Sequence, residues 1–165
     1  MRNERWLKAT TGNHGFSLIE LLVALSILAL LASVAAPFAD IAIQRKKEEE
    51  LRYALRTIRD AIDNYHHAVV DGRAPRAMSG GSYPRSLQVL VDGVEDEKSP
   101  QKKKIYFLRR IPRDPFADKE EKPEATWGKR SYASSAEEPR EGDDVYDVYS
   151  RSDKEGLNGV PYRLW

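Results

Sequence analysis

The sequence contains no cysteine. This absence excludes disulfide frameworks, thiolate metal sites and cysteine nucleophiles, but it leaves the compartment open because exported proteins can lack cysteine. A strong charge of one sign is also missing, since 27 Lys and Arg stand against 26 Asp and Glu for a net charge of +1. General nucleic-acid binders are normally basic overall, so no nucleic acid is expected as a partner.

Patterns that would indicate catalysis are missing as well. The chain has neither a Gly-rich phosphate loop nor a nucleophile elbow. Adjacent His66 and His67 would point about 100° apart on a helix, so they are expected at the surface and not as a metal-binding pair. The acidic clusters have no His or Lys partner at a spacing typical of acid–base chemistry. We therefore expect a protein that is not an enzyme.

A single long apolar run stands out against an otherwise polar sequence. Residues 21–39 carry no charged side chain. A helix over these residues would be about 28 Å long at about 1.5 Å per residue, close to the hydrocarbon core of a bilayer. We therefore expect a transmembrane segment. The alternative is a secretory signal peptide cut near Ala36, although the apolar region of such peptides is usually about 7–15 residues long.

The helical pattern continues beyond the apolar run. After Asp40, apolar residues recur at steps of three or four and form one helical face: Leu51, Leu55, Ile58, Ile62, Tyr65 and Val69. Gly72 suits the position just after a helix. The sequence therefore predicts one helix over residues 16–70, about 80 Å long, with a kink at Pro37 because proline removes a backbone hydrogen bond.

The residues before the apolar run form a recognisable motif. A polar leader with Arg2, Arg5 and Lys8 runs into the segment Gly15-Phe16-Ser17-Leu18-Ile19-Glu20-Leu21-Leu22-Val23. This arrangement closely resembles the prepilin signal of type IV pilins and type II secretion pseudopilins. The resemblance implies that a membrane-embedded prepilin peptidase cuts between Gly15 and Phe16 and methylates the new amine of Phe16.

Glu20 has a defined place in this motif, as the fifth residue after the cut. A carboxylate at the start of a membrane span is energetically costly unless another group compensates its negative charge. The dipole of the helix N-terminus does so in part. The resemblance implies that the amine of Phe16 meets Glu20 of a neighbouring subunit during filament assembly. The alternative is an interfacial Glu20 that reaches water.

Charge alone does not decide how the segment crosses the membrane. Basic residues precede the apolar run, which favours a cytoplasmic N-terminus, but Arg45, Lys46 and Lys47 follow it and favour the reverse. The resemblance of the leader to prepilin signals implies that the C-terminal part lies in the periplasm.

Residues 73–165 hold most of the proline and glycine, so we expect a small, loop-rich region there. Pro84 is expected at the first position of a short helix with an apolar face of Leu87, Leu90 and Val91. Short strands are expected at residues 131–135 and 145–150. These elements would pack on the second half of the long helix.

Three C-terminal motifs narrow the resemblance. In chain order they are Tyr83-Pro84, Ile111-Pro112-Arg113-Asp114-Pro115-Phe116 and Asp147-Val148-Tyr149-Ser150. Their order and spacing resemble the major pseudopilins of type II secretion, a family often called protein G. We expect Asp114-Pro115 to form a structural turn.

One stretch departs from that family, whose members typically bind calcium in an Asp-rich loop after the Tyr-Ser strand. Residues 150–158 correspond to that loop, and Asp153, Glu155 and Asn158 could supply a weak calcium site. Two basic residues within the stretch oppose a bound cation. The alternative is a metal-free loop held by salt bridges and by packing of Trp165.

The expected fold is α+β and pilin-like, with a long N-terminal helix packed on a small antiparallel sheet with long loops. Its expected segments are a leader at residues 1–15, a transmembrane and assembly half-helix at 16–39, an amphipathic periplasmic half-helix at 40–72 and a globular region at 73–165.

The expected function is that of a structural subunit of a type II secretion pseudopilus. Such a subunit would cross the inner membrane once and assemble into a periplasmic filament. Its partners would be copies of itself, other pseudopilins, the prepilin peptidase and the inner-membrane secretion platform. Two alternatives stay open: a type IV pilus or DNA-uptake pilin, including a minor one, and a membrane-anchored periplasmic protein that does not polymerise.

Overall fold

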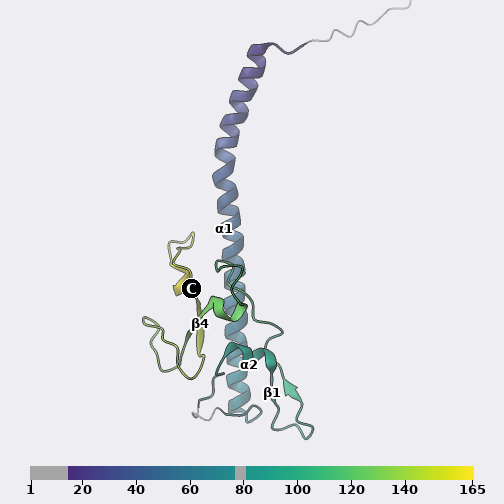
Figure 1. Ribbon diagram of the computed structural model, residues 1–165, viewed down its shortest axis with the longest axis vertical. Helices are drawn as coiled ribbons and strands as arrows, with labels where there is room; N and C mark the ends of the chain where they lie inside the picture. Colours follow the sequence, from purple (N-terminus) through teal and green to yellow (C-terminus); the bar gives the residue numbers. More distant parts are fainter. Residues whose placement is uncertain (1–14, 77–80) are drawn as a thin grey trace, which may run out of the picture. The chain divides into compact units, whose positions relative to one another are not determined.

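The computed structural model describes residues 15–76 and 81–165, without the side chains of residues 34–37. The chain divides into two compact units, Met1–Ile41 and Ala42–Trp165. Helix α1 (Leu18–Val70) contributes to both units, and every other helix and strand belongs to the second (Figure 1). One long helix with small antiparallel sheets confirms the expected α+β, pilin-like fold.

Within the first unit, the part that is described is the start of α1. No residue of its most apolar 18-residue window is buried, and α1 is long and apolar enough to cross a membrane. The predicted leader lies outside the described residues, apart from Gly15. The kink expected at Pro37 stays a prediction, because the side chain of this residue also lies outside the described part.

In the second unit, α1 supplies one wall of the hydrophobic core. The apolar face predicted from the sequence is confirmed, because every residue of it is at most 6% exposed: Leu51, Leu55, Ile58, Ile62, Tyr65 and Val69. Each buried aliphatic side chain of this size contributes about 1.5–3 kcal/mol relative to an exposed one. Most stability of the second unit therefore depends on the packing of other elements against this face.

Helix α1 ends at Val70, as the sequence predicts. Gly72 has a φ of 65°, a left-handed conformation that glycine adopts without the penalty of a Cβ. Its N–H donates to the Val69 carbonyl (3.0 Å), and the Arg73 N–H donates to the Ala68 carbonyl (2.8 Å). These bonds satisfy carbonyls that the last helical turn would otherwise leave free.

The next elements are α2 (Leu87–Asp92) and a small hairpin of β1 (Val94–Glu95) and β2 (Lys104–Ile105). Leu87 and Leu90 are fully buried, as expected from the apolar pattern. The expected helix start at Pro84 is wrong, because the N-cap is Ser86. The Pro84 carbonyl instead accepts from the Val145 N–H (2.7 Å), so this residue bonds to the segment just before the last strand.

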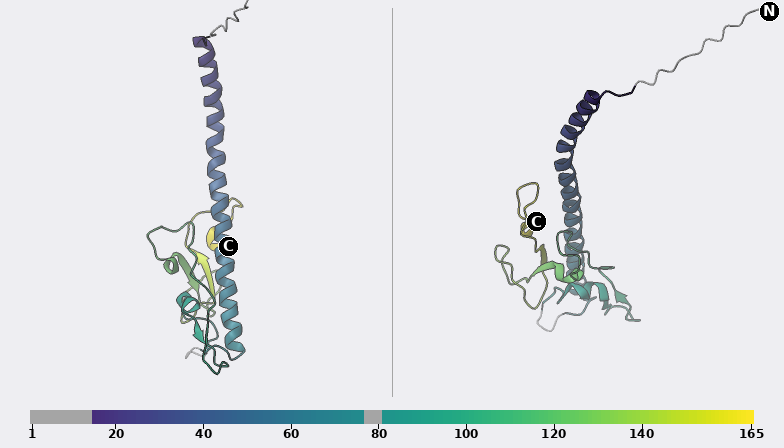
Figure 2. Two further views of the ribbon diagram at one scale, coloured as in Figure 1. Left: turned by 90° about the vertical axis from the view of Figure 1, so that its right-hand side faces the viewer. Right: turned by 45° about the horizontal axis from the view of Figure 1, so that its top comes forward.

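The second sheet pairs β3 (Trp127–Arg130) with β4 (Asp147–Ser150), which lies beside α1 (Figures 1 and 2). A short 3₁₀ helix, η1 (Pro123–Thr126), precedes β3, and another, η2 (Tyr162–Leu164), follows β4. The prediction of β4 is confirmed, but the strand expected at residues 131–135 is wrong. Those residues form a turn, and the strand precedes them.

The turn after β3 has a clear physical cause. The Asp144 carboxylate accepts from the Ser131 hydroxyl (2.6 Å) and from the Tyr132 N–H (3.1 Å). The Ser134 N–H donates to the Ser131 carbonyl (3.1 Å). Serine side chains that bond nearby backbone compete with strand pairing, which explains why β3 stops at Arg130.

Candidate functional site

The backbone at residues 15–17 is non-helical and lies just before α1. Phe16 is 75% exposed. A Cβ added at Gly15 would meet no described atom within 4 Å. The Gly15–Phe16 peptide bond therefore lies in an open segment of non-helical backbone, the form in which a peptidase can bind a chain.

Ser17 caps the helix, a role that the sequence reasoning missed. Its hydroxyl accepts from the Glu20 N–H (3.2 Å), and its carbonyl accepts from the Leu21 N–H (3.2 Å). The signal was visible in the sequence, because Ser-x-x-Glu before an apolar run is the pattern of a capping box. This cap satisfies one backbone donor that the helix start leaves without an intrahelical partner.

Glu20 lies in the first turn of α1 and is exposed. Its carboxylate is attracted to the positive end of the helix dipole. Among the described residues, no basic side chain forms an ion pair with Glu20. The carboxylate is therefore available to a positive group from outside the described part of the chain.

The polar side chains of the apolar segment bond to the helix itself. The Ser26 hydroxyl donates to the Leu22 carbonyl (2.8 Å), and the Ser33 hydroxyl donates to the Leu30 carbonyl (2.8 Å). Hydroxyls that are satisfied within the helix cost little in lipid or against another apolar helix. The exposed surface of this segment is thus suited to an apolar surrounding.

These features coincide with a known sequence family. Residues 10–36 match the prokaryotic N-terminal methylation motif. The match covers Gly15, Phe16, Ser17 and Glu20 and much of the apolar run. No curated protein and no solved structure matches the chain.

The chain therefore carries a prepilin-type signal, which supports a place in the pilin superfamily. Such a signal indicates processing by a prepilin peptidase. The long apolar helix and the motif together fit a membrane-anchored, single-pass protein.

In the second unit, the structure brings together two motifs that are far apart in the sequence. The buried Asp114 carboxylate accepts from the Ser150 hydroxyl at the end of β4 and from the Phe116 N–H (2.7 Å). The Asp114 N–H donates in turn to the Thr126 hydroxyl (3.2 Å). The turn expected at Asp114-Pro115 is thus a junction that fixes β4 to the segment before β3.

Replacement of Asp114 by alanine is expected to lower the free energy of unfolding by about 2–3 kcal/mol, because it leaves buried donors without a partner. Asp118→Ala is the matched control, since the Asp118 carboxylate accepts a similar turn bond from the Glu120 N–H (3.2 Å) on the exposed surface. Urea unfolding of the full chain in detergent measures both. Equal losses in the two variants would contradict the role assigned to Asp114.

The three residues of the predicted calcium site lie on the exposed loop after β4. The Asn158 side-chain oxygen already accepts from the Val160 N–H (3.1 Å), and Glu155 forms a backbone bridge with Pro161. Among the described residues, no group of three or more His, Cys, Asp or Glu side chains could hold a metal ion. Calcium prefers six or more oxygens with several carboxylates, which two exposed carboxylates and one engaged amide do not provide. The donor set fits calcium poorly, and the site stays a prediction.

A buried carboxylate from α1 holds this loop instead. Glu48 is 5% exposed, and its Oε1 atom accepts from the Leu157 N–H (2.7 Å) and the Tyr162 hydroxyl (3.0 Å). Gln44 donates to the same Glu48 oxygen (3.3 Å) and to the Tyr162 hydroxyl oxygen (3.0 Å). Burial raises the pKa of Tyr162 above its ordinary value, so the phenol remains protonated and able to donate. We name these four residues the Glu48 cluster.

Proposed function

We propose that this chain is a structural subunit of a type II secretion pseudopilus. The observation that carries the proposal is the start of α1. An open Gly15–Phe16 bond precedes a serine-capped helix with Glu20 in its first turn, and an exposed apolar surface follows in the described part. A prepilin peptidase would cut this bond, and the apolar helices of many copies would then pack into a filament.

The proposed filament lies in the periplasm and drives protein export across the outer membrane. Copies of this chain, other pseudopilins and the inner-membrane secretion platform are the proposed partners. The chain itself has no catalytic role in this proposal, because Gly15 and Glu20 are features that the peptidase and the neighbouring subunit recognise. The Asp114–Ser150 junction supports the finer assignment, since it joins two of the motifs that resemble major pseudopilins.

Two alternatives differ from this proposal in ways that can be observed. A type IV pilus or DNA-uptake pilin would share the maturation, so the neighbouring genes would discriminate between the two filaments. A membrane-anchored protein that does not polymerise would work without the carboxylate of Glu20. The absence of a cysteine pair and the pseudopilin-like motifs favour the secretion filament.

The maturation step is tested by the N-terminal mass of the protein from membranes of a host with a prepilin peptidase. We expect a chain that starts at Phe16 and is heavier by one methyl group. Gly15→Val should leave the chain uncut, and a side chain at this position would meet no described atom, so the fold of the described part is expected to be kept. Ser17→Ala is the matched control and should still be cut. An intact Met1 in the wild type, or a cut near Ala36, would contradict the proposal.

A further inference from the structure

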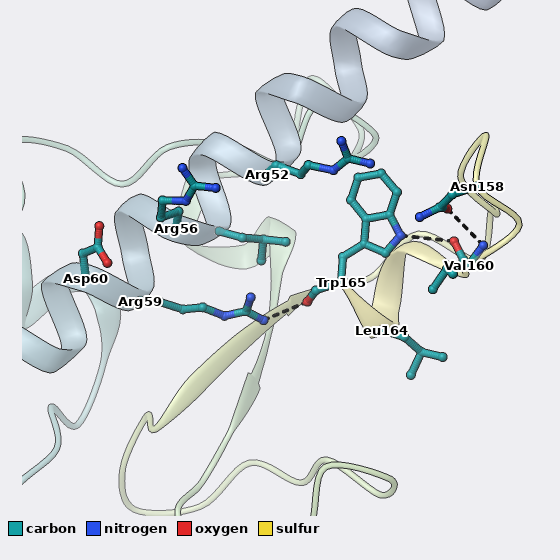
Figure 3. A pocket seen from close by; sticks show the side chains of 9 residues that line it. Arg52, Arg56, Arg59, Asp60, Asn158, Val160, Leu164 and Trp165 are labelled. Atoms are coloured by element: carbon teal, nitrogen blue, oxygen red, sulfur yellow. Dashed lines mark hydrogen bonds between the residues drawn. The ribbon is translucent and has the colours of Figure 1, made fainter.

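A basic groove runs between α1 and the C-terminal residues of the second unit (Figure 3). Its volume is about 500 Å³. We use the name basic groove for the cavity lined by Arg52, Leu55, Arg56, Arg59, Asp60, Asn158, Val160, Leu164 and Trp165. Three arginines and one acidic side chain contribute to this lining, and with Arg59 paired to Asp147 the remaining side chains leave the groove positive.

Two of the three guanidinium groups have no carboxylate partner in the described part of the chain. Arg59 is engaged, because it donates to the Asp147 carboxylate (2.8 Å) and to the backbone oxygen of Trp165 (2.8 Å). Arg52 lies over the Trp165 ring, 4.4 Å from its centre, and forms no ion pair. Arg56 is exposed one helical turn further along and also forms none.

The chemistry of the groove is that of a carboxylate-binding surface with an apolar floor. A guanidinium group binds a carboxylate with two parallel hydrogen bonds, and stacking on Trp165 holds Arg52 in a fixed orientation for this. Buried Leu55 and the indole of Trp165 exclude water from one side, which strengthens such bonds. A peptide segment with several acidic side chains fits this combination.

The second unit itself presents such a segment at residues 137–143. Glu137, Glu141 and Asp143 are exposed and have no ion-pair partner among the described residues, whereas Glu138 pairs with Arg140 (2.9 Å). In the described part of the chain, no hydrogen bond of this segment reaches an arginine of the basic groove. Within one copy, the segment lies beside the groove, because Ala136 and Pro139 line a neighbouring cavity with Arg59 and Trp165, but its free carboxylates form no ion pair with the groove among the described residues.

We propose that the basic groove binds residues 137–143 of a second copy of this chain. This inference rests on the proposed function, because a filament brings identical copies together at high local concentration. A contact between the groove of one copy and the segment of the next joins two different surfaces, so it can repeat along a filament. It would fix the rotation of neighbouring second units, which an apolar helix contact leaves weakly specified.

The absence of cysteine allows a direct crosslinking test in membranes. One tagged copy carries Arg56→Cys and a differently tagged copy carries Glu141→Cys. A short thiol-reactive linker should then yield a heterodimer at about tenfold the level of a pair in which Lys103→Cys replaces Arg56→Cys. Lys103 is an exposed basic residue beside the β1–β2 hairpin, outside the groove.

A charge exchange supplies the second readout. For this test, the groove copy carries Leu164→Cys and the segment copy carries Ser135→Cys. Arg52→Glu with Arg56→Glu in the groove copy should remove the crosslink to a segment that is otherwise wild type. Glu137→Lys with Glu141→Lys in the partner copy should restore it. If the loss of the crosslink came from misfolding of the groove copy, a second change in the segment copy would not restore it. Recovery therefore shows that the two charged surfaces contact each other.

Each remaining outcome decides against the inference. A link only within one chain that carries both cysteines would show that the segment closes on its own groove. Links only to other proteins would show a different partner. Sheared filaments without any groove crosslink would overturn this inference and leave the filament proposal intact, whereas maturation without filaments would count against the filament itself.

Discussion

Replacement of Glu48 by alanine is expected to lower the free energy of unfolding by about 3 kcal/mol, one of the largest single effects in the second unit. The change removes one oxygen that accepts from the Leu157 N–H, the Tyr162 hydroxyl and Gln44. Tyr162 is fully buried, so its hydroxyl would lose a partner that water cannot easily replace. The loop after β4 would detach from α1 first.

Glu49→Ala is the matched control, because Glu49 is the next residue of the same helix and is exposed. It should change the free energy of unfolding by no more than about 0.5 kcal/mol. Glu48→Gln keeps one oxygen acceptor and should fall between the two. Urea unfolding of the full chain in detergent, followed by tyrosine and tryptophan fluorescence, measures all three. A loss at Glu49 equal to that at Glu48 would show that the cluster does not hold the loop.

The Glu48 cluster marks the limit of what the sequence could predict in the second unit. The apolar face of α1 follows from a local rule, since residues three or four apart share one side of a helix. Glu48 follows from no such rule. Its burial depends on Leu157 and Tyr162, more than a hundred residues later in the chain. A glutamate in a charged run is read as a solvated side chain until those partners are known.

The position of β3 shows the same limit for strands. Gly128 has a low intrinsic preference for a strand, so residues 127–130 gave no local signal. In the structure, a Cβ at this position would collide with the ring of Tyr149 on the paired strand. The absence of a side chain at Gly128 therefore leaves room for the Tyr149 ring to lie across the paired strand. Cross-strand packing overrides the local preference, and only the structure shows it.

The N-terminal features were predictable because all of their information is local. The order of leader, Gly15, Phe16 and Glu20 and the apolar run lie within one short stretch. The cap by Ser17 is also local and was recognisable from its spacing to Glu20, although the resemblance to a peptidase substrate drew attention to the other residues. The loop at residues 150–158 differs from the N-terminal features, because its structure depends on distant residues. Calcium binding was expected there only from the resemblance, whereas the observed contacts of the loop include bonds to α1.

The replacement Glu20→Gln is expected to abolish filament assembly while maturation continues. In the proposed filament, the carboxylate of Glu20 pairs with the amine of Phe16 from a neighbouring copy in an apolar surrounding. Loss of one member of a buried, hydrogen-bonded charge pair costs about 2–5 kcal/mol per contact. Since each 1.4 kcal/mol is about tenfold in association, the yield of sheared filaments should fall by more than about tenfold.

Glutamine separates the charge of Glu20 from its backbone bond at the start of the helix. Glu20→Gln keeps the bond from the Glu20 N–H to the Ser17 hydroxyl and a side chain of similar size, and it removes only the charge. Ser17→Ala is the complementary control, because it removes the cap bond to the Glu20 N–H and keeps the carboxylate. If charge pairing drives assembly, Ser17→Ala should form filaments and Glu20→Gln should not. Filaments from Glu20→Gln at the wild-type level would show that assembly does not need the charge of Glu20 and would contradict the proposed charge pair.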